Sequence, residues 1–145
     1  QQHQGLVVGT PPSLGYCVQI SADGLAVGGG FHAASPAQTA AWRAAADAPG
    51  TGSEIARLVA AATATGAEVR GEQVKTTPRG YAVDHPRIDL IRRRELMLIE
   101  PLGAPDWLET PAALDEIANR WRRLTPLLTI LDAALGSVPT PTRAR

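Results

Sequence analysis

The sequence predicts one α+β domain, in which an antiparallel or mixed β-sheet carries helices mainly on one face and a long C-terminal helix is kinked near Pro126. Three observations lead to this fold class. Strand-like segments gather before residue 31, helix-like segments follow them, and one strongly apolar segment, Glu95–Glu100, returns late in the chain. Strands that precede the helices, instead of alternating with them, favour an α+β sheet over a doubly wound parallel one.

The early strands are defined by apolar runs and turn residues. Gly5–Gly9 is a short apolar run, and Tyr16–Ser21 alternates with period two, which is typical of a strand with one buried face. Asp23-Gly24 follows at once and predicts a tight hairpin. The return strand is expected over Leu25–Val27, ending at Gly28-Gly29-Gly30. These glycines lack the pattern of a phosphate-binding loop, so we interpret them as a strand end that packs closely against another element.

Two helices are expected after the hairpin. Ser35 can cap the first helix, and Pro36 suits its first turn. This helix is expected to run to about Ala48, where Pro49-Gly50 should stop it. The second helix is expected over Ser53–Thr65, because apolar residues recur on one face there.

The middle of the chain predicts short elements joined by a long loop. Ala67–Val74 is expected to form a pair of short strands, and Thr76–Pro86 a loop marked by proline and glycine. Arg87–Arg93 predicts a short helix. The apolar strand that follows, Glu95–Glu100, should be stopped by Pro101, which cannot donate a ladder hydrogen bond.

A long helix is expected to close the domain, beginning near Thr110-Pro111 and ending at Gly136. Pro126 should kink or split this helix, because proline cannot bond to the carbonyl group four residues before it. The domain thus spans residues 1–136, and the Pro- and Thr-rich segment 137–145 is expected to be disordered. The apolar stripe of the helix is formed by Leu114, Ile117, Trp121, Leu124, Leu128 and Leu131.

Composition narrows the possible functions. The chain has 14 Lys and Arg residues against 14 Asp and Glu residues, so it lacks the broad positive field that drives non-specific nucleic-acid binding. No run approaches the roughly 20 apolar residues of a membrane helix. Cys17 is the only cysteine, so no internal disulfide forms, and we interpret it as a small apolar strand residue in a cytoplasmic protein.

Polar residues gather between positions 75 and 94, which predicts a cleft that favours anions. The residues expected to bind the ligand are Lys75, Arg79, His85, Arg92 and Arg94. Arginine binds phosphate or carboxylate through a planar fork of N–H donors. The run Arg92-Arg93-Arg94 also fits a solvated helix C-terminus, where cations are favoured. The other arginine cluster, expected on the solvated side of the last helix, is Arg120, Arg122 and Arg123.

His85 offers a catalytic alternative. It could act as a general base that Asp84 or Asp89 orients. Alternatively, Asp84 or His85 could cap the short helix that Pro86 introduces. The three histidines show no metal-ligand spacing, so no metal site is predicted. Neither a nucleophile elbow nor a dinucleotide fingerprint is present, so the sequence implies no particular cofactor.

Seven short motifs follow one another across Gly5–Leu135. They are Leu14-Gly15-Tyr16, Val27-Gly28-Gly29-Gly30, Ser35-Pro36, Thr77-Pro78-Arg79-Gly80-Tyr81, Asp84-His85-Pro86, Asp89-Leu90-Ile91-Arg92 and Leu124-Thr125-Pro126-Leu127. In order and spacing they resemble the C-terminal part of the family called domain of unknown function 2461, a conserved hypothetical family of bacteria and some eukaryotes. The resemblance implies no reaction, substrate or cofactor. It implies that a further N-terminal segment, helical in the family, or a partner chain completes the fold.

Three functions follow as hypotheses. The first is a small-ligand binding or regulatory module that takes a small anion such as phosphate, without nucleic-acid or membrane partners. The second is an enzyme that acts on a phosphorylated small molecule with His85 as its base. The third is a structural protein-interaction domain with an exposed apolar patch around Trp42 or Trp107. Geometry separates them, because an enzyme needs His85 within reach of a carboxylate in a concave pocket.

Overall fold

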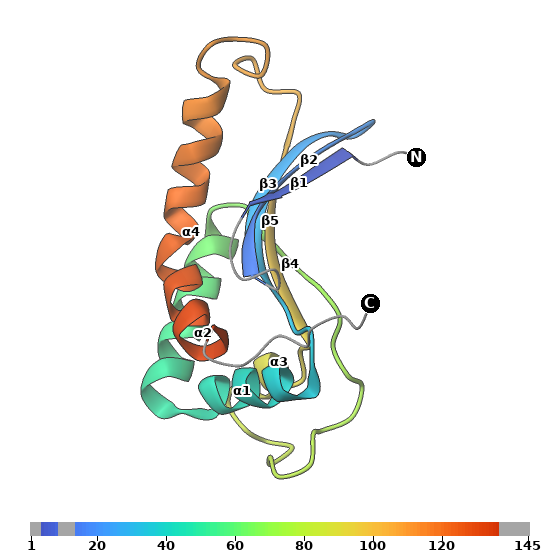
Figure 1. Cartoon of the computed structure of the whole chain (residues 1–145), viewed down its shortest axis with the longest axis vertical. Helices are drawn as coiled ribbons and strands as arrows, with labels where there is room; N and C mark the ends of the chain where they lie inside the picture. The colour runs from blue at the N-terminus through green and yellow to red at the C-terminus, as the bar shows by residue number, and fades with distance from the viewer. Residues whose placement is uncertain (1–3, 9–13, 137–145) are drawn as a thin grey trace, which may run out of the picture.

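The computed structural model describes residues 4–8 and 14–136, and it confirms the α+β class (Figure 1). Within these residues, five strands form one sheet in the order β1-β2-β3-β5-β4, and each neighbouring pair is antiparallel. The strands are β1 (Gln4–Val8), β2 (Leu14–Ser21), β3 (Gly24–His32), β4 (Glu68–Arg70) and β5 (Glu95–Gly103). The helices are α1 (Pro36–Asp47), α2 (Pro49–Ala64), α3 (Ile88–Ile91) and α4 (Ala113–Leu135).

Figure 1 shows the helices on one side and at one end of the sheet, as the sequence predicted. Helix α4 is the longest of them and runs alongside the strands. The predicted tail, 137–145, lies outside the described residues, as does Gly9 at the end of the first predicted strand.

The β2–β3 hairpin forms where Asp23-Gly24 predicted it. Ser21 pairs with Gly24, and the turn residues are Ala22 and Asp23. Gly24 has a φ angle of 107°, and a Cβ at this position would lie 2.4 Å from the carbonyl oxygen of Gly103. Both the dihedral angle and the lack of space therefore favour glycine at the start of β3.

Strand β3 is longer than predicted, because its glycines are paired on both sides instead of ending the strand. Gly28 and Gly29 lie between β2 and β5, and the strand continues to His32. A Cβ on Gly28 would lie 2.1 Å from the carbonyl oxygen of Leu98, and one on Gly29 would lie 3.0 Å from the carbonyl oxygen of Gly15. The glycines therefore allow a close approach of neighbouring strands, but in the middle of the sheet.

Strand β5 also runs past its predicted end, since Pro101 lies within it. Strand β4 pairs only with Met97–Ile99, so the following part of β5 is an edge on that side. Proline is tolerated at an edge or a bulge, where no ladder donor is needed, and the register with β3 shifts between Leu25 and Ala26, opposite Pro101. Of the strand pair expected at 67–74, only β4 forms as a strand.

Helix α1 begins as predicted, whereas α2 begins earlier than predicted. Ser35 caps α1 and accepts a hydrogen bond from the backbone N–H of Gln38 at 3.1 Å. Helix α1 ends at Asp47, and Ala48 alone separates it from α2, which opens with Pro49. The dipeptide Pro49-Gly50 therefore follows one helix and starts the next, because proline fits the first turn of a helix.

The closing helix α4 starts at residue 113, shortly after the predicted Thr110-Pro111. Pro126 lies inside the helix and does not split it. Leu128 and Leu131 are buried, as their spacing predicted, whereas Leu114 is 80% exposed. Apolar spacing thus identified the buried face of the helix, but it could not show how far the layer beneath extends.

The core lies between the sheet and the helices. Its almost completely buried apolar side chains include Phe31, Trp42, Ile55, Ile91, Leu96, Leu98, Leu127, Leu131 and Leu135. The rings of Trp42 and Phe31 lie 4.6 Å apart, and the Trp42 indole Nε1 donates to the carbonyl of Leu90 at 2.8 Å. Trp42 therefore joins α1 to β3 and α3, and it does not contribute to an exposed apolar patch.

Gly28→Ala is expected to lower the free energy of unfolding by about 1–3 kcal/mol, the usual cost of overpacking. The added Cβ would meet backbone atoms of β5, which cannot swing aside as the end of a side chain can. Urea denaturation measures the difference. Gly50→Ala is the matched control, since a Cβ at Gly50 meets nothing within 4 Å and alanine is the better helix former. Equal stability of the two variants would contradict the close pairing of β3 and β5.

Candidate functional site

The arginines of the predicted anion cleft mostly bind the protein itself. Arg92 donates from Nε to the carbonyl of Val74 at 2.9 Å and from Nη2 to the carbonyl of Lys75 at 2.7 Å. Arg94 lies 3.6 Å from Glu72 in an exposed ion pair, which contributes little stability. Arg92 therefore holds the loop backbone in place, and two of its nitrogens are occupied.

Lys75 and Arg79, the two other predicted cations, extend from exposed positions of the loop. Within residues 4–8 and 14–136, neither side chain has an ion-pair partner. The five predicted ligand-binding residues thus divide into two groups. Three of them (His85, Arg92 and Arg94) contact protein acceptors or donors, and two are free to meet a ligand.

His85 is fixed by hydrogen bonds at both ring nitrogens. Its Nδ1 accepts from the backbone N–H of Arg87 at 2.9 Å, so the proton of the neutral ring resides on Nε2. The Nε2–H group donates to the Asp47 carboxylate at 2.8 Å. The partner is therefore Asp47 of α1, whereas Asp84 is exposed. His85 stabilises the turn before α3 but does not cap that helix, whose N-cap is Arg87 without a side-chain cap. A base at this position would first have to release one of these bonds.

Arg87 completes a fixed corner between α1 and α2. Its Nε donates to the carbonyl of Ala46 at 2.7 Å and its Nη2 to the carbonyl of Asp47 at 2.9 Å. These are the last carbonyl groups of α1, where a cation is favoured. Gly52 of α2 lies directly against them, since a Cβ there would lie 2.2 Å from the carbonyl oxygen of Ala46. Sequence reasoning did not single out Arg87, because its partners lie about 40 positions away in the chain.

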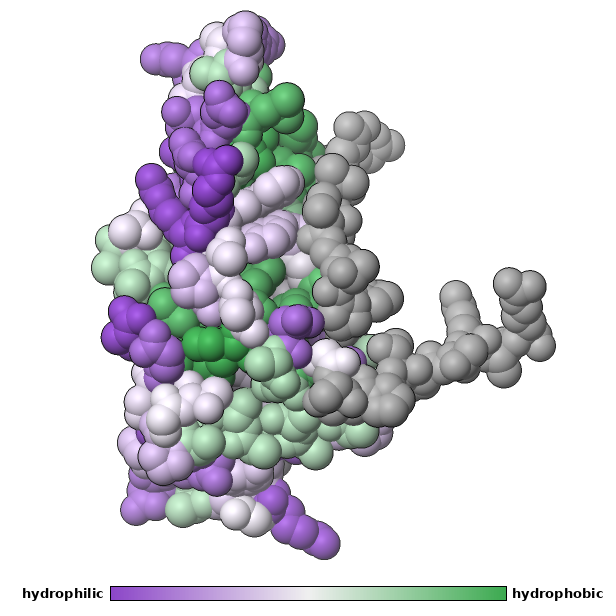
Figure 2. All heavy atoms as spheres, turned by 60° about the vertical axis from the view of Figure 1, so that its left-hand side comes forward, coloured by the Kyte–Doolittle hydropathy of each residue, from purple (hydrophilic) through white to green (hydrophobic). Residues whose placement is uncertain are grey.

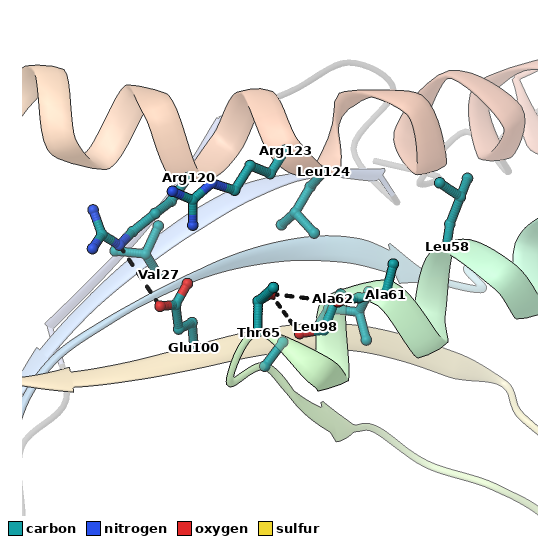
Figure 3. A pocket seen from close by; sticks show the side chains of 11 residues that line it. Val27, Leu58, Ala61, Ala62, Thr65, Leu98, Glu100, Arg120, Arg123 and Leu124 are labelled. Carbon is teal, nitrogen blue, oxygen red and sulfur yellow. Dashed lines mark hydrogen bonds and ion pairs between the residues drawn. The ribbon is translucent and has the colours of Figure 1, made fainter.

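A cavity of about 250 Å³ lies beneath α4, and we call it the α4 cavity (Figure 3). Its floor comes from β3 and β5, its roof from α4, and one wall from the last turns of α2. Seven of its eleven lining residues have wholly apolar side chains, and the other four carry polar or charged groups. The lining residues are Val27, Leu58, Ala61, Ala62, Thr65, Ala67, Leu98, Glu100, Arg120, Arg123 and Leu124.

Arg120 is the most buried cation of the cavity, with a side chain that is 17% exposed. Its Nη1 donates to the Glu116 carboxylate at 2.9 Å, and its guanidinium lies 5.1 Å from the centre of the Trp107 ring. On the other side, its Nε lies 3.8 Å from Glu100, too far for a hydrogen bond (Figure 3). This Nε is buried and finds no hydrogen-bond acceptor among the described residues.

Arg123 lies on the same side of α4 as Arg120, at the rim of the cavity. It is exposed, and the part of the chain that the structure describes gives it no ion-pair partner. The neighbouring Arg122 does not line the cavity and donates to the side chain of Asn119 instead. In Figure 2, hydrophilic residues gather along the upper left of the view, and hydrophobic surface lies next to them.

The prediction that the arginines of α4 all face solvent is therefore wrong for Arg120. A signal was present in the spacing: Arg120 lies three residues after Ile117 and four before Leu124, so the three share one helix face. Glu100 lies at the end of the predicted late strand. Nothing in the sequence indicated that this strand and the closing helix would bring Glu100 and Arg120 together.

A second, more open groove of about 860 Å³ lies among α1, α2 and α4. Its lining is mainly alanine, and its charged residue, Glu54, forms an ion pair with Arg57. Apart from Glu54, the only polar side chain of its lining is that of Thr51, so the groove holds no cation that could meet an anionic ligand. The α4 cavity is the better candidate, because it combines an apolar lining with charged groups.

The described ranges, 4–8 and 14–136, contain no group of three or more His, Cys, Asp or Glu residues able to hold a metal ion. None of their helices is long and apolar enough to cross a membrane.

Cys17 lies in β2 and is 3% exposed. Burial raises the pKa of its thiol, although a hydrogen bond with the backbone of Gly28 and the charge of Arg70 act in the opposite direction. A thiol with a raised pKa is a poor nucleophile near neutral pH, which supports the structural interpretation of this residue.

Comparison with known proteins identifies a family. A family model described as conserved hypothetical protein (DUF2461) matches residues 2–129, which include every strand and most of α4. No curated protein and no solved structure matches the chain.

Arg87→Lys is expected to lower the free energy of unfolding by about 1–3 kcal/mol, because lysine keeps the charge but cannot donate to two carbonyls in a fixed fork. Urea denaturation at constant pH measures this loss. Arg79→Lys provides the control, since the exposed Arg79 has no ion-pair partner in the described residues, and it should change stability by less than about 0.5 kcal/mol. Losses of equal size would show that the α1–α2 corner does not depend on Arg87.

Cys17 is expected to react with Ellman's reagent at pH 8 at least about 100-fold more slowly in the folded protein than in urea, because the thiol must first be exposed by opening of the sheet. The absorbance of the released thiolate follows the reaction. Rapid labelling of the folded protein, equal to that of the denatured chain, would contradict the burial of Cys17.

Proposed function

Since the chain belongs to the DUF2461 family of conserved hypothetical proteins, whose description assigns no reaction, we propose a function from the geometry: a module that binds a small anionic ligand in the α4 cavity. The ligand would lie between α4 and the sheet, with its charge toward Arg120 and Arg123. The observation that carries this proposal is that Arg120, although ion-paired with Glu116 and Glu100, has no hydrogen-bond acceptor at Nε above an apolar cavity.

The energetic argument concerns the buried Nε of Arg120. A buried donor without an acceptor costs about 1–3 kcal/mol, and more when the group is charged. An anionic ligand that approaches this nitrogen would recover part of that cost while its apolar portion contacts the seven apolar lining residues. The cation and the apolar surface would therefore act on one ligand together.

The alternative anion site, the loop at 75–94, has weaker support. Arg92 and His85 hold backbone and carboxylate partners there, so ligand binding would need to displace existing bonds. Lys75 and Arg79 offer free charges, but they are exposed, where water and salt compete with a ligand. In the α4 cavity, a ligand could bind Arg123 without displacing an existing ion pair, and it would also meet the half-buried cation of Arg120.

A binding module also fits the geometry better than an enzyme does. The lining of the α4 cavity contains no His, Cys or Ser, and its one hydroxyl, Thr65, donates to the carbonyl of Ala62 at 2.9 Å. His85, the proposed base of the enzyme alternative, is absent from this lining. We further propose that the protein works in the cytoplasm, where the buried thiol of Cys17 stays reduced.

The test is a screen of small carboxylates, phosphates and sulfonates by thermal shift, with methyl NMR spectra to locate the site. Ligand at about 100 times its dissociation constant should add about 2.7 kcal/mol of stability. Arg123→Gln should weaken binding about tenfold, as expected for the loss of a charge-assisted hydrogen bond, whereas Arg122→Gln should bind normally. Arg79→Gln reports on the alternative loop. Binding that is lost in Arg79→Gln and retained in Arg123→Gln would refute the α4 cavity.

A further inference from the structure

The α4 cavity also constrains the chemical class of its ligand. Resting on the proposed function, we infer that the ligand is a monocarboxylate with a short hydrocarbon body, and that Glu100 sets this preference by repelling dianions such as phosphate monoesters. Four features carry the inference: the size of the cavity, the distribution of its charges, the free side of Arg120 and the position of Glu100.

The size and lining of the cavity select a short, apolar body. Its volume of about 250 Å³ falls below the roughly 300–1,000 Å³ of pockets for drug-sized ligands. A nucleotide or a sugar phosphate would also need several polar partners, whereas the cavity offers seven apolar side chains. A chain of a few methylene groups is the simplest body that such a lining can surround.

The polar groups of the cavity gather at one end. Figure 3 shows Arg120 and Glu100 at one side of the cavity, while Leu58 and Leu124 lie toward the other. The hydroxyl of Thr65, on the α2 wall, is already bonded to the carbonyl of Ala62. The matching ligand therefore carries its charge at one terminus only.

The free side of Arg120 matches a carboxylate. Because Nη1 donates to Glu116, the fork formed by Nε and Nη2 faces away from that bond. In the described residues, neither of these two nitrogens has a hydrogen-bond acceptor. Two parallel N–H groups match the two oxygens of a carboxylate, and they also match two oxygens of a phosphate. The geometry of Arg120 therefore fits both a carboxylate and a phosphate, and the selection between them must come from the charge of the ligand.

Glu100 favours a single negative charge. The two arginines of the lining already face two carboxylates, that of Glu100 and that of Glu116, which is bonded to Arg120, so each negative charge on a ligand is added to a balanced group. Glu100 is 22% exposed and lies 3.8 Å from Arg120, where a second negative charge would be poorly screened. A Cβ on Gly66 would lie 4.0 Å from the Glu100 Cγ, so this carboxylate also stands at the negative end of α2. A dianion would meet both repulsions.

The experiment compares three probes that share one hydrocarbon chain: hexanoate, 1-hexanol and hexyl phosphate. Titration calorimetry at pH 8, where the phosphate monoester is a dianion, gives the affinities, and the methyl signals of Leu58, Leu98 and Leu124 locate the bound probe. Hexanoate is expected to bind at least about tenfold more tightly than either other probe. Shortening it by one methylene should cost about fourfold. Urea denaturation of each variant confirms that it is folded.

Glu100→Gln tests the selectivity directly, because it removes the repelling charge and keeps the shape. It should raise the affinity for hexyl phosphate at least about fivefold relative to that for hexanoate. Equal changes for both probes would overturn the role of Glu100. Hexyl phosphate binding to the unaltered protein as tightly as hexanoate would overturn the carboxylate inference and leave the proposed function standing. If no anion shifts the three methyl signals, or hexanol binds as tightly as hexanoate, both the inference and the proposed function fail.

Discussion

The contact on which the rest of the structure depends is the close packing of α4 on the bare backbone of β3. Gly29 lies beneath Leu124: a Cβ there would be 3.5 Å from the Leu124 Cδ1, an ordinary contact distance, so only a side chain larger than alanine would separate the helix from the sheet. The indole of Trp121 fixes the same part of the helix by donating to a backbone carbonyl of β2 at 3.0 Å. Both contacts lie within one turn of Arg120 and Arg123, so they determine how high these arginines stand above the strands. The cavity exists because α4 is fixed at this height while α2 ends beside it.

Besides the ligand-binding role proposed for Arg120 and Arg123, other arginines of this chain have a purely structural role. Arg43 donates to the carbonyl of Ile91 at 3.1 Å, and Arg87 and Arg92 each bind two carbonyl groups. A guanidinium can do this because its donors form a rigid fork, whereas an ammonium group offers a single point of charge. These bonds tie the loop between β4 and β5 to α1 and to its own backbone. Among the positive charges that drew attention in the sequence, Arg92 therefore stabilises irregular backbone and has two of its nitrogens occupied.

How far the sequence could predict this molecule depended on the range of each interaction. The hairpin at Asp23-Gly24 and the cap at Ser35 follow from neighbouring residues, and both are confirmed. The extension of β3 through its glycines could not be foreseen, because it depends on β5, which pairs with it from far along the chain. His85 illustrates the same limit, since its carboxylate partner comes from α1, 38 positions away. The cavity around Arg120 combines α2, α4 and the sheet, and no local pattern encodes such a combination.

The environment of Arg120 is the feature that most supports the proposed ligand site. A fully exposed arginine holds an anion weakly, because water and salt compete for both partners. A fully paired, buried arginine has no donor left to offer. Arg120 lies between these limits: it contacts Glu116 and Trp107, and Glu100 forms an ion pair with it at 3.8 Å but stands too far from Nε to accept a hydrogen bond. An incoming carboxylate could therefore add the missing acceptor without breaking an existing hydrogen bond, and its hydrocarbon chain would fill the space between α2 and α4. Ligand binding and helix packing would then stabilise each other, as linkage requires.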